Sequence, residues 1–345
     1  MEAENLEQLT PGQLQLIASQ RWFHLFVPEQ YGGLSLSLPE AVQLEESIAW
    51  ADGNIGWVVT LCSGASMFIG YFQDELTKTV FSNPRVCLAG SGQAGGIAER
   101  YADGFKVTGS WPHASGAPHA DYFTANCVIR HNGEIVTGPD EKSLIQSFLF
   151  KKEEVTLYPT WKYMGLKATA GYSFSVEKLF VPTIRTFIID ADHTRLPGSI
   201  YQYPFAPLAE STIAANISGM CLHFLDLAKE IIFKKKDIQS GFKAGTGKSL
   251  QLLADAVSAI QLLREQFYER LDHSWKVHVA NNNIDADTLL AVSESSRQLA
   301  HQARHWVSLL YPFCGLAAAH TGTFINRVWR NIHTASQHSL LNDKR

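Results

Sequence analysis

The sequence predicts an α+β protein in which an N-terminal helical region precedes a small antiparallel β barrel or sandwich and a C-terminal helical bundle. From Val86 the spacing of the hydrophobic residues changes from helical to alternating, and from Phe205 the helical spacing returns. Prolines mark the exit from the alternating region: Pro182, Pro197, Pro204 and Pro207. We therefore expect three domains, at residues 1–84, 85–190 and 191–345, the last a four-helix-type bundle.

The composition is that of an ordinary globular protein and limits the expected partners. Hydrophobic residues make up 46% of the 345 residues and charged residues 18%, with a formal net charge of −4, so no nucleic acid or other polyanion is indicated. Because no run of 18 apolar residues and no apolar N-terminal signal region occur, we expect no membrane-spanning segment. Five scattered cysteines without a C-x-x-C pair predict reduced thiols and a cytoplasmic protein. No cluster of His, Cys and carboxylate residues has metal-ligand spacing, so no metal is predicted.

Three helices are expected in the N-terminal region. Thr10 is a good N-cap for a helix at residues 11–20, with a proline at its first position. Ser37, followed by Glu40, forms a capping box for a second helix. Asn54 is the expected cap of a third helix that carries Trp57.

Short alternating segments predict the strands of the β region. We expect strands at residues 86–89, 99–101, 105–111, 121–129, 147–150, 155–157 and 173–180. Such short strands, separated by turns, favour a small antiparallel barrel or sandwich.

The C-terminal region is expected to form long helices that pack as a bundle. The helical stripe of Leu252, Leu253, Ala256 and Ile260 is typical of a core-facing helix. We expect helices at residues 208–236, 249–280, 285–314 and 321–341.

One stretch, VTGSWPHASGAPHAD at Val107–Asp121, combines small residues, a hydroxyl and two histidines. Small residues let backbone and hydroxyl donors approach a flat ligand closely, although a glycine-rich hairpin end has the same composition. The composition alone leaves both readings open.

This stretch resembles the flavin-contacting strand and loop of the acyl-CoA dehydrogenase superfamily, with its pattern G-x-W-x-x-(A)-S-G-x-x-H-A-D. The resemblance implies that Trp111 and Gly116 belong to the cofactor site and that the Ser115 hydroxyl lies near flavin N5. It places His113 where an aromatic residue packs on the ring or lines the substrate cavity, and it gives His119 a place in the loop or near the substrate.

Other segments extend the resemblance over nearly the whole chain. The segments Phe26–Leu34 and Glu45–Trp57 are similar to the N-terminal helical domain of this superfamily. Trp161 and the segment 164–170 resemble a flavin-contacting strand pair, in which Thr169 is the best candidate. The resemblance therefore implies an acyl-CoA dehydrogenase fold, and by the same likeness a homotetramer.

The C-terminal residues distinguish two branches of the superfamily. Arg330 resembles a cofactor-site landmark, with Asn331 in the place of the usual aspartate, and the position of the common dehydrogenase base is Gly322. No carboxylate lies between Cys314 and Asn331, so this segment offers no base, although some dehydrogenases take their glutamate from an earlier helix.

The ending R-N-I-H-T-A-S-Q-H resembles that of the two-component flavin-dependent monooxygenases, such as those acting on 4-hydroxyphenylacetate or dibenzothiophene. In that branch the last histidine, here His338, supports the C4a-hydroperoxide together with the serine, here Ser115. A histidine can also exchange a proton near neutral pH, for example with a phenolic substrate.

Two glycine motifs resemble nucleotide-binding motifs, but their sequence context does not fit such sites. Gly90–Gly95 reads G-x-G-x-x-G, but the next predicted element is a β-hairpin where a dinucleotide fold needs a helix. In the superfamily this loop lies beside the flavin and the substrate cavity, which makes Gly92 a candidate substrate contact. Gly245–Ser249 resembles the end of a P-loop, but no strand precedes it, and we expect a linker capped at Ser249.

Three functions remain open at this point. The first is a flavin-dependent monooxygenase that hydroxylates a small aromatic or heteroaromatic compound with reduced FMN or FAD from a separate reductase. The second is an acyl-CoA dehydrogenase or related flavin oxidase whose base lies elsewhere. The third is a non-catalytic relative that keeps the scaffold. The sequence does not separate FMN from FAD.

Overall fold

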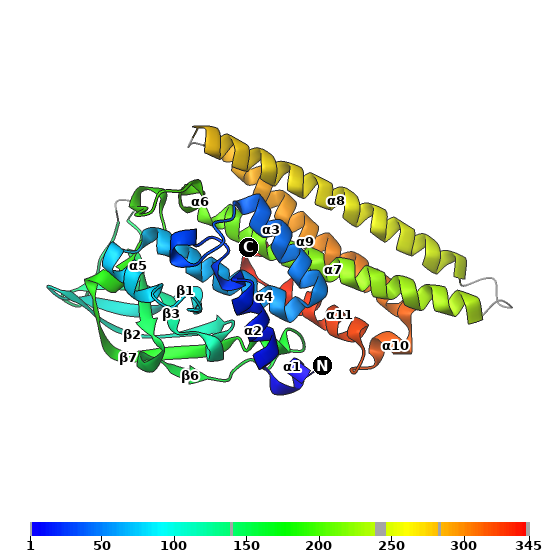
Figure 1. Cartoon of the computed structure of the whole chain (residues 1–345), viewed down its shortest axis with the longest axis horizontal. Helices are drawn as coiled ribbons and strands as arrows, with labels where there is room; N and C mark the ends of the chain where they lie inside the picture. The colour runs from blue at the N-terminus through cyan, green and yellow to red at the C-terminus, as the bar shows by residue number, and fades with distance from the viewer. Residues whose placement is uncertain (1, 139–140, 239–245, 282–283, 343–345) are drawn as a thin grey trace.

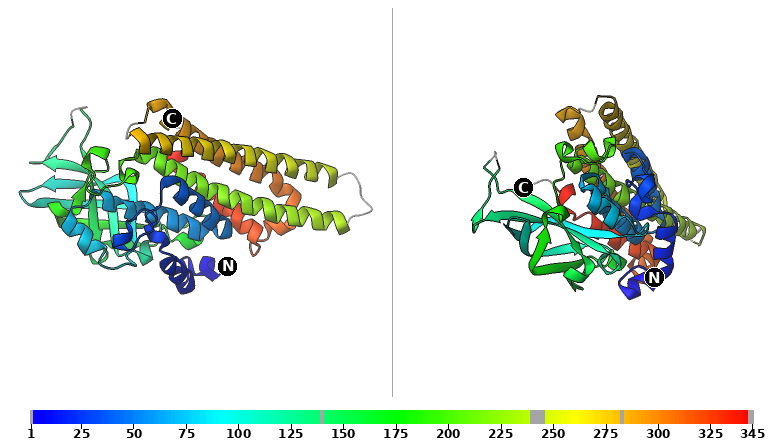
Figure 2. Two further views of the ribbon diagram at one scale, coloured as in Figure 1. Left: turned by 45° about the horizontal axis from the view of Figure 1, so that its top comes forward. Right: turned by 60° about the vertical axis from the view of Figure 1, so that its left-hand side comes forward.

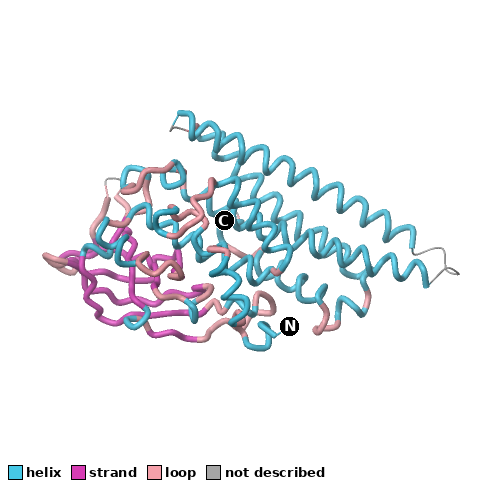
Figure 3. The backbone as a smooth tube through the Cα atoms, in the orientation of Figure 1, coloured by secondary structure: helices cyan, strands magenta, loops and turns pink. Residues whose placement is uncertain are grey.

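The computed structural model describes residues 2–138, 141–238, 246–281 and 284–342. A β-sheet lies at one end of the molecule, long helices extend away from it, and the N-terminal helices α3 (Leu38–Ala51) and α4 (Gly53–Ser66) lie between them (Figure 1). Two other views show the same arrangement (Figure 2), and the strands are confined to one end of the backbone (Figure 3). The mixed helix and sheet composition agrees with the expected fold class.

The N-terminal helices begin where the sequence provides caps. Thr10 and Gln13 form a reciprocal capping box at the start of α2 (Pro11–Ser19). The backbone N–H and the hydroxyl of Ser37 both donate to Glu40 at the start of α3. Both predicted caps are therefore confirmed. The helices α1 (Glu2–Leu6) and α5 (Asp74–Val80) were not predicted from the sequence.

The predicted cap of the third helix is wrong. Asp52 caps α4, since its Oδ1 accepts the backbone N–H groups of Asn54 at 2.8 Å and Ile55 at 3.3 Å. The Asn54 side chain instead accepts the N–H of Ala168 at 3.1 Å, in a segment far along the chain. Asn54 therefore ties α4 to the β region.

The strands form one sheet in the order β6-β7-β2-β1-β3-β5-β8, with β4 paired to β3. The strands are β1 (Leu88–Arg100), β2 (Gly104–Ala114), β3 (Tyr122–His131), β4 (Glu134–Ile135), β5 (Ile145–Lys151), β6 (Thr156–Tyr158), β7 (Tyr172–Pro182) and β8 (Thr186–Phe187). The prediction of a wholly antiparallel arrangement is wrong at one pair, because β1 and β3 are parallel. β3 lies beside β1 on the side away from β2, so two reversals of the chain leave β1 and β3 pointing the same way.

The two short strands predicted at residues 86–89 and 99–101 overlap the two ends of the single strand β1, which is irregular between Ser91 and Gly96. The glycines of this strand allow close backbone packing. A Cβ on Gly90 would lie 2.0 Å from Thr124 Oγ1, and one on Gly96 would lie 2.4 Å from the Trp111 ring. The G-x-G-x-x-G motif is thus part of a strand that leads into β2.

The helical bundle contains three long helices, α7 (Phe205–Ile238), α8 (Thr246–Asn281) and α9 (Ala286–Cys314), preceded by α6 (Ser199–Gln202). α9 packs against both α7 and α8, and α3 packs against α7. Ser249 lies inside α8 and is not its cap, while Gly245 of the expected linker lies outside the described residues. Arg264 of α8 forms a bidentate ion pair with Glu46 of α3. Its Nε donates to Oε1 at 2.8 Å and its Nη2 to Oε2 at 2.6 Å.

The predicted last helix at residues 321–341 is divided in two. After α10 (Leu316–Ala319), helix α11 (Phe324–Ala335) ends at Ser336, and a short 3₁₀ helix, η9 (Ser339–Leu341), follows. His338 is the N-cap of η9. The break matters because it places His338 at a helix start, where its ring nitrogen can accept a backbone N–H.

Two apolar cores hold these parts together. The first core includes buried aromatic side chains of the strands: Trp111, Phe123, Phe150 and Phe174. The long helices bury the second core, which includes Phe224. Of the described residues, Gly53–Tyr71 is the one segment whose length and hydropathy would allow it to cross a membrane, and 89% of it is buried inside the protein. It packs here as a core helix.

Candidate functional site

The turn after β2 carries Ser115 and is fixed by contacts on both sides. The N–H of Gly116 donates to Thr169 O at 2.8 Å, and Cys62 of α4 contacts the Ser115 carbonyl oxygen at 3.6 Å. Gly116 has a φ of +77°, and a Cβ there would lie 2.9 Å from Cys62 Sγ. The turn therefore needs glycine at this position, and its geometry presents the buried Ser115 side chain toward α4.

Ser115 and His338 meet on the side chain of Trp57. The indole Nε1–H donates to Ser115 Oγ at 3.2 Å. The His338 ring lies edge-on to the same indole, with ring centroids 5.9 Å apart and an interplanar angle of 65°. The two predicted catalytic residues, 223 positions apart in sequence numbering, thus share one neighbour.

The N-cap position of His338 determines its tautomer. His338 Nδ1 accepts the backbone N–H of Leu340 at 3.3 Å. Because a backbone N–H only donates, Nδ1 must carry a lone pair, and the proton of the neutral ring resides on Nε2. Burial of the ring, and secondly the charge of nearby His113, lower the pKa of His338 to about 4. At neutral pH His338 is therefore a hydrogen-bond donor, and the expectation that it takes up a proton near neutral pH is not supported.

His113 lies in a group of aromatic side chains close to His338. Its Nε2 is 3.1 Å from the hydroxyl of Tyr163, and its ring is perpendicular to that of Trp161 at 5.9 Å. The ring centroids of Trp161 and Tyr163 are 4.5 Å apart. His113 has a φ of +66°, a backbone conformation that is strained for a residue with a Cβ. Partial burial lowers the pKa of His113, so this exposed ring is also largely neutral at pH 7.

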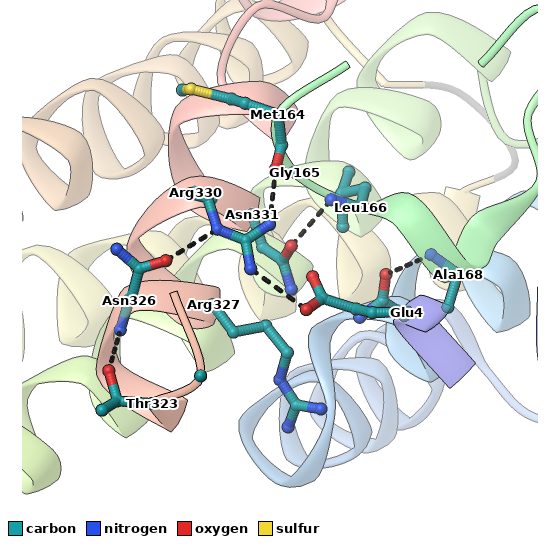
Figure 4. A network of polar contacts seen from close by, with 12 residues as sticks. Glu4, Met164, Gly165, Leu166, Ala168, Thr323, Asn326, Arg327, Arg330 and Asn331 are labelled. Carbon is teal, nitrogen blue, oxygen red and sulfur yellow. Dashed lines mark hydrogen bonds and ion pairs between the residues drawn. The ribbon is translucent and has the colours of Figure 1, made fainter. Parts of the chain in front are cut away.

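The segment 164–168, which precedes Thr169, is held by hydrogen bonds to distant parts of the chain, chiefly to α11 (Figure 4). The N–H of Leu166 donates to Asn331 Oδ1 at 2.7 Å, and Arg330 donates to the carbonyl oxygen of Met164. Asn331 stands where the superfamily usually has aspartate, and its amide oxygen supplies the same acceptor without a buried negative charge.

The guanidinium of Arg330 is occupied by groups of this chain. Besides Met164, it donates to Asn326 Oδ1 at 2.8 Å and forms an ion pair with Glu4 at 3.0 Å (Figure 4). The predicted role of Arg330 in cofactor binding remains a prediction. The contacts in the structure assign it the support of the segment that leads to Thr169.

Thr169 and Trp161 lie close to the Ser115 turn but use their polar atoms locally. The Thr169 hydroxyl donates to Leu166 O at 2.8 Å, inside the 3₁₀ turn η6 (Lys167–Thr169). The Trp161 indole donates to Gly165 O at 3.3 Å, and its ring covers Gly171. Trp161 can therefore offer a ligand its aromatic face, and Thr169 can offer only its backbone.

The other predicted site residues lie apart from the contact between Ser115 and His338. Trp111 is buried in the sheet, stacked on Phe174 at 5.2 Å, with its indole N–H donated to Asn126 O at 3.0 Å. Gly92 lies on an exposed part of β1, where a Cβ would meet nothing within 4 Å. His119 is half-buried, and burial together with the charge of Lys152 lowers its pKa to about 4.

No carboxylate perturbs the predicted site among the residues that the structure describes. The influences on the pKa of His338 are burial and His113. Gly322, at the position of the usual dehydrogenase base, lies exposed in the turn before α11. Three acids of the earlier helices are buried: Glu4 and Glu46 are paired with Arg330 and Arg264, and Glu45 accepts a hydrogen bond from the Ser63 hydroxyl at 3.4 Å. Within the described ranges, no group of three His, Cys, Asp or Glu residues could hold a metal ion.

Comparison with known proteins agrees with this fold. Residues 211–343 match the family model described as "Acyl-CoA dehydrogenase, C-terminal domain". The C-terminal part of the chain is therefore similar to this family. The resemblance inferred from the sequence motifs is thereby confirmed.

Proteins named as monooxygenases are similar to the chain over most of its length. The chain is 24% identical to the "Flavin-dependent monooxygenase, oxygenase subunit HsaA" of Rhodococcus jostii (strain RHA1), over 100% of the chain and 91% of that protein. It is 24% identical to an "Indole-3-acetate monooxygenase" of Acinetobacter baumannii, over 93% of the chain and 81% of that protein. The solved structure of 3-HSA hydroxylase from Rhodococcus sp. RHA1 shares the fold, with a TM-score of 0.91 at 23% identity, covering 100% and 89% of the two chains.

Sequence reasoning missed Trp57 as a site residue. The sequence places Trp57 on a helix and at the end of a family-like segment, but no sequence pattern shows that its N–H donates to Ser115. Tyr163 was missed for the same reason. Tyr163 lies two residues after Trp161, but this spacing does not by itself indicate a site residue. The structure shows that both rings contact His113.

Proposed function

We propose that this chain is the oxygenase component of a two-component flavin-dependent monooxygenase. In this proposal it hydroxylates a small aromatic or heteroaromatic substrate with O2 and with reduced FMN or FAD delivered by a separate reductase. The observation that carries the proposal is the meeting of the Ser115 hydroxyl and the neutral His338 ring on Trp57, beside a segment that offers no carboxylate base. The names of the relatives from Rhodococcus and Acinetobacter support the same reaction class and an aromatic substrate.

The residues present fit a flat flavin ring. The Ser115 hydroxyl proton and His338 Nε2–H have no protein acceptor within the described part of the chain. Both donors are therefore available to the edge of a ligand. The rings of His113, Trp161 and Tyr163 offer apolar faces next to them, and Gly116 keeps the turn free of a side chain.

Each of these groups has a definite task in the reaction. Bound reduced flavin supplies the two electrons that activate O2. Ser115 donates a hydrogen bond from its hydroxyl, while Trp57 keeps that hydroxyl from rotating away. His338 donates from Nε2 and remains neutral, so that it adds no positive charge to a buried site. A flat ligand that covers the rings of His113, Trp161 and Tyr163 would exclude water from this site and strengthen both hydrogen bonds.

Rapid mixing tests the proposal. The purified protein is loaded anaerobically with chemically reduced FMN or FAD and then mixed with O2. We expect oxidised flavin to reappear much more slowly than from free flavin, and we expect hydroxylated product when phenols or indoles are included. Reoxidation at the rate of free flavin, with one peroxide formed per flavin, would contradict the proposal.

Two further experiments distinguish the proposed function from a dehydrogenase and from a non-catalytic relative. Anaerobic bleaching of bound oxidised flavin by acyl-CoAs would indicate a dehydrogenase whose base lies outside the usual position. Failure to bind flavin at all, in equilibrium dialysis with FMN and FAD, would indicate a non-catalytic relative.

The proposal includes an assembly and a location. The chain forms a homotetramer in the cytoplasm, with the domains 1–84, 85–190 and 191–345 and with the β domain curved as a barrel or sandwich. Exposed apolar side chains on the bundle support self-association: Leu262, Val279, Leu290, Leu309, Leu316 and Phe324. The five cysteines are free and buried, which agrees with a reducing compartment. Light scattering of the eluting protein gives the oligomeric state, and limited proteolysis gives the domain boundaries.

A further inference from the structure

Trp57 contacts both predicted catalytic residues, although its own side chain neither titrates nor reacts. It is 5% exposed and lies on α4, the buried helix that also contacts β1 and α7. An indole has a single N–H donor and no acceptor. Its one hydrogen bond goes to Ser115 Oγ, and its ring packs against the ring of His338.

The hydrogen bond determines what the Ser115 hydroxyl can offer. A serine hydroxyl has one proton and two lone pairs, and Trp57 occupies one of the lone pairs. The proton and the second lone pair remain for a ligand. Without the indole N–H, the buried hydroxyl would be free to rotate, and serine hydroxyls readily turn to nearby backbone carbonyls. Trp57 therefore controls the direction in which Ser115 donates.

The ring contact has a similar consequence for His338. The Leu340 N–H holds Nδ1, and the contact with the Trp57 ring limits rotation of the His338 ring about that bond. Nε2–H then has one preferred direction. Since the same indole contacts both side chains, a shift of Trp57 would displace the two donors relative to each other.

We propose that Trp57 is a positioning residue that holds the Ser115 hydroxyl and the His338 ring in one relative orientation toward the bound ligand. The identity of that ligand, a flavin, rests on the proposed function. The contact itself can be tested in the protein without flavin, so the two ideas can fail separately.

The first test measures hydrogen exchange of the tryptophan indole N–H groups by NMR in the protein without flavin. Ser115→Ala removes the acceptor of the Trp57 N–H and leaves Trp57 in place. We expect the Trp57 indole to exchange about tenfold faster in this variant. Trp111, whose indole donates to Asn126 O at 3.0 Å, is the internal reference and should not change. Equal exchange of Trp57 in both proteins would overturn the proposal.

The second test is a double-mutant cycle on the affinity for FMN and FAD, measured by fluorescence titration. Trp57→Phe keeps an aromatic ring beside His338 but removes the N–H donor. We expect it to weaken flavin binding about twofold to tenfold, and to have no further effect in a Ser115→Ala background. The matched control is Trp50→Phe, which removes an exposed indole hydrogen bond to Asp226 at 2.9 Å and should leave flavin affinity unchanged.

The outcomes of the cycle are distinct. An effect of Trp57→Phe that is the same in both backgrounds, or equal to that of Trp50→Phe, would overturn the positioning role. If the unmodified protein binds no flavin, the proposed function fails, and the exchange measurement still decides whether Trp57 holds Ser115.

Discussion

Arg330 on α11 forms an ion pair with Glu4 on the N-terminal helix α1, with Nη2 and Oε2 3.0 Å apart. Both side chains are largely buried, with 12% and 7% of their surface exposed. The same guanidinium holds the carbonyl oxygen of Met164. One arginine on α11 thus connects helix α1 to the segment that leads to Thr169.

We expect Arg330→Met to destabilise the protein by about 3 to 5 kcal/mol, because it leaves the Glu4 carboxylate buried without its partner. Urea unfolding measures the change. The matched control is Lys162→Met, which removes the exposed ion pair between Lys162 and Glu7, also 3.0 Å long. That change should cost about 1 kcal/mol or less. Equal losses in the two variants would show that the Arg330 pair is not a buried structural contact.

Gly116→Ala should destabilise the protein more than the same substitution at another glycine of similar conformation. Gly116 and Gly133 have φ values of +77° and +82°, but a Cβ would touch Cys62 only at Gly116 and would meet nothing within 4 Å at Gly133. Gly133→Ala should cost about 1 to 2 kcal/mol from backbone strain alone. Thermal unfolding measures both losses of stability. A larger loss for Gly116→Ala would show the cost of the contact with α4, and equal losses would contradict that contact.

His338→Asn separates the two functions of the His338 ring. Asparagine is a good N-cap and can replace Nδ1 as the acceptor for Leu340, but it does not reach as far as Nε2. We expect unfolding stability within about 1 kcal/mol of the unmodified protein. We also expect a loss of roughly 100-fold in the rate of product formation, because one donor at the reacting edge is gone. The ratio of peroxide to product, assayed with reduced flavin, checks this result, and unchanged coupling would exclude a donor role for Nε2.

Stability should fall between pH 5 and pH 8 because of Glu45. Burial is the main cause that raises the pKa of this carboxyl to about 8, against the opposing effect of the Ser63 and Thr60 hydroxyls. A carboxyl whose pKa is raised by folding contributes its full stability below the pKa of the unfolded chain, near 4.5. That contribution is lost as the pH rises through about 8.

Glu45→Gln should remove most of this pH dependence, since glutamine does not titrate. Its stability relative to the unmodified protein should therefore be higher at pH 8.5 than at pH 5. Glu40→Gln is the control, because Glu40 lies at the exposed start of α3 and its pKa is lowered by Ser37. Parallel stability curves for Glu45→Gln and the unmodified protein, from pH 5 to pH 8.5, would contradict this account of Glu45.

The sequence predicted the elements whose signals are local. The caps at Thr10 and Ser37 and the long helices follow from neighbouring residues, and the structure places them as expected. At the start of α4 two good cap residues, Asp52 and Asn54, compete, and the sequence does not show that Asn54 is needed by Ala168. The break after α11 was also missed, because Ser336 and Gln337 carry no glycine or proline signal.

In the candidate site too, residues within local motifs could be predicted from the sequence, whereas contacts between distant elements could not. Ser115 and His338 each stand in a family-like run of residues and could be selected from it. Their common neighbour Trp57 comes from a third element, and the tautomer of His338 depends on Leu340. Packing between elements and the direction of single hydrogen bonds are not encoded in any short pattern. The parallel pairing of β1 with β3 was missed for that reason too.

The most direct test of the central claim is a crystal structure of the protein with bound FMN or FAD. We expect one edge of the isoalloxazine ring to lie within about 3 Å of both Ser115 Oγ and His338 Nε2, with no carboxylate over the ring. A flavin bound elsewhere, or a glutamate placed over the ring where it could remove a carbon-bound proton, would contradict it.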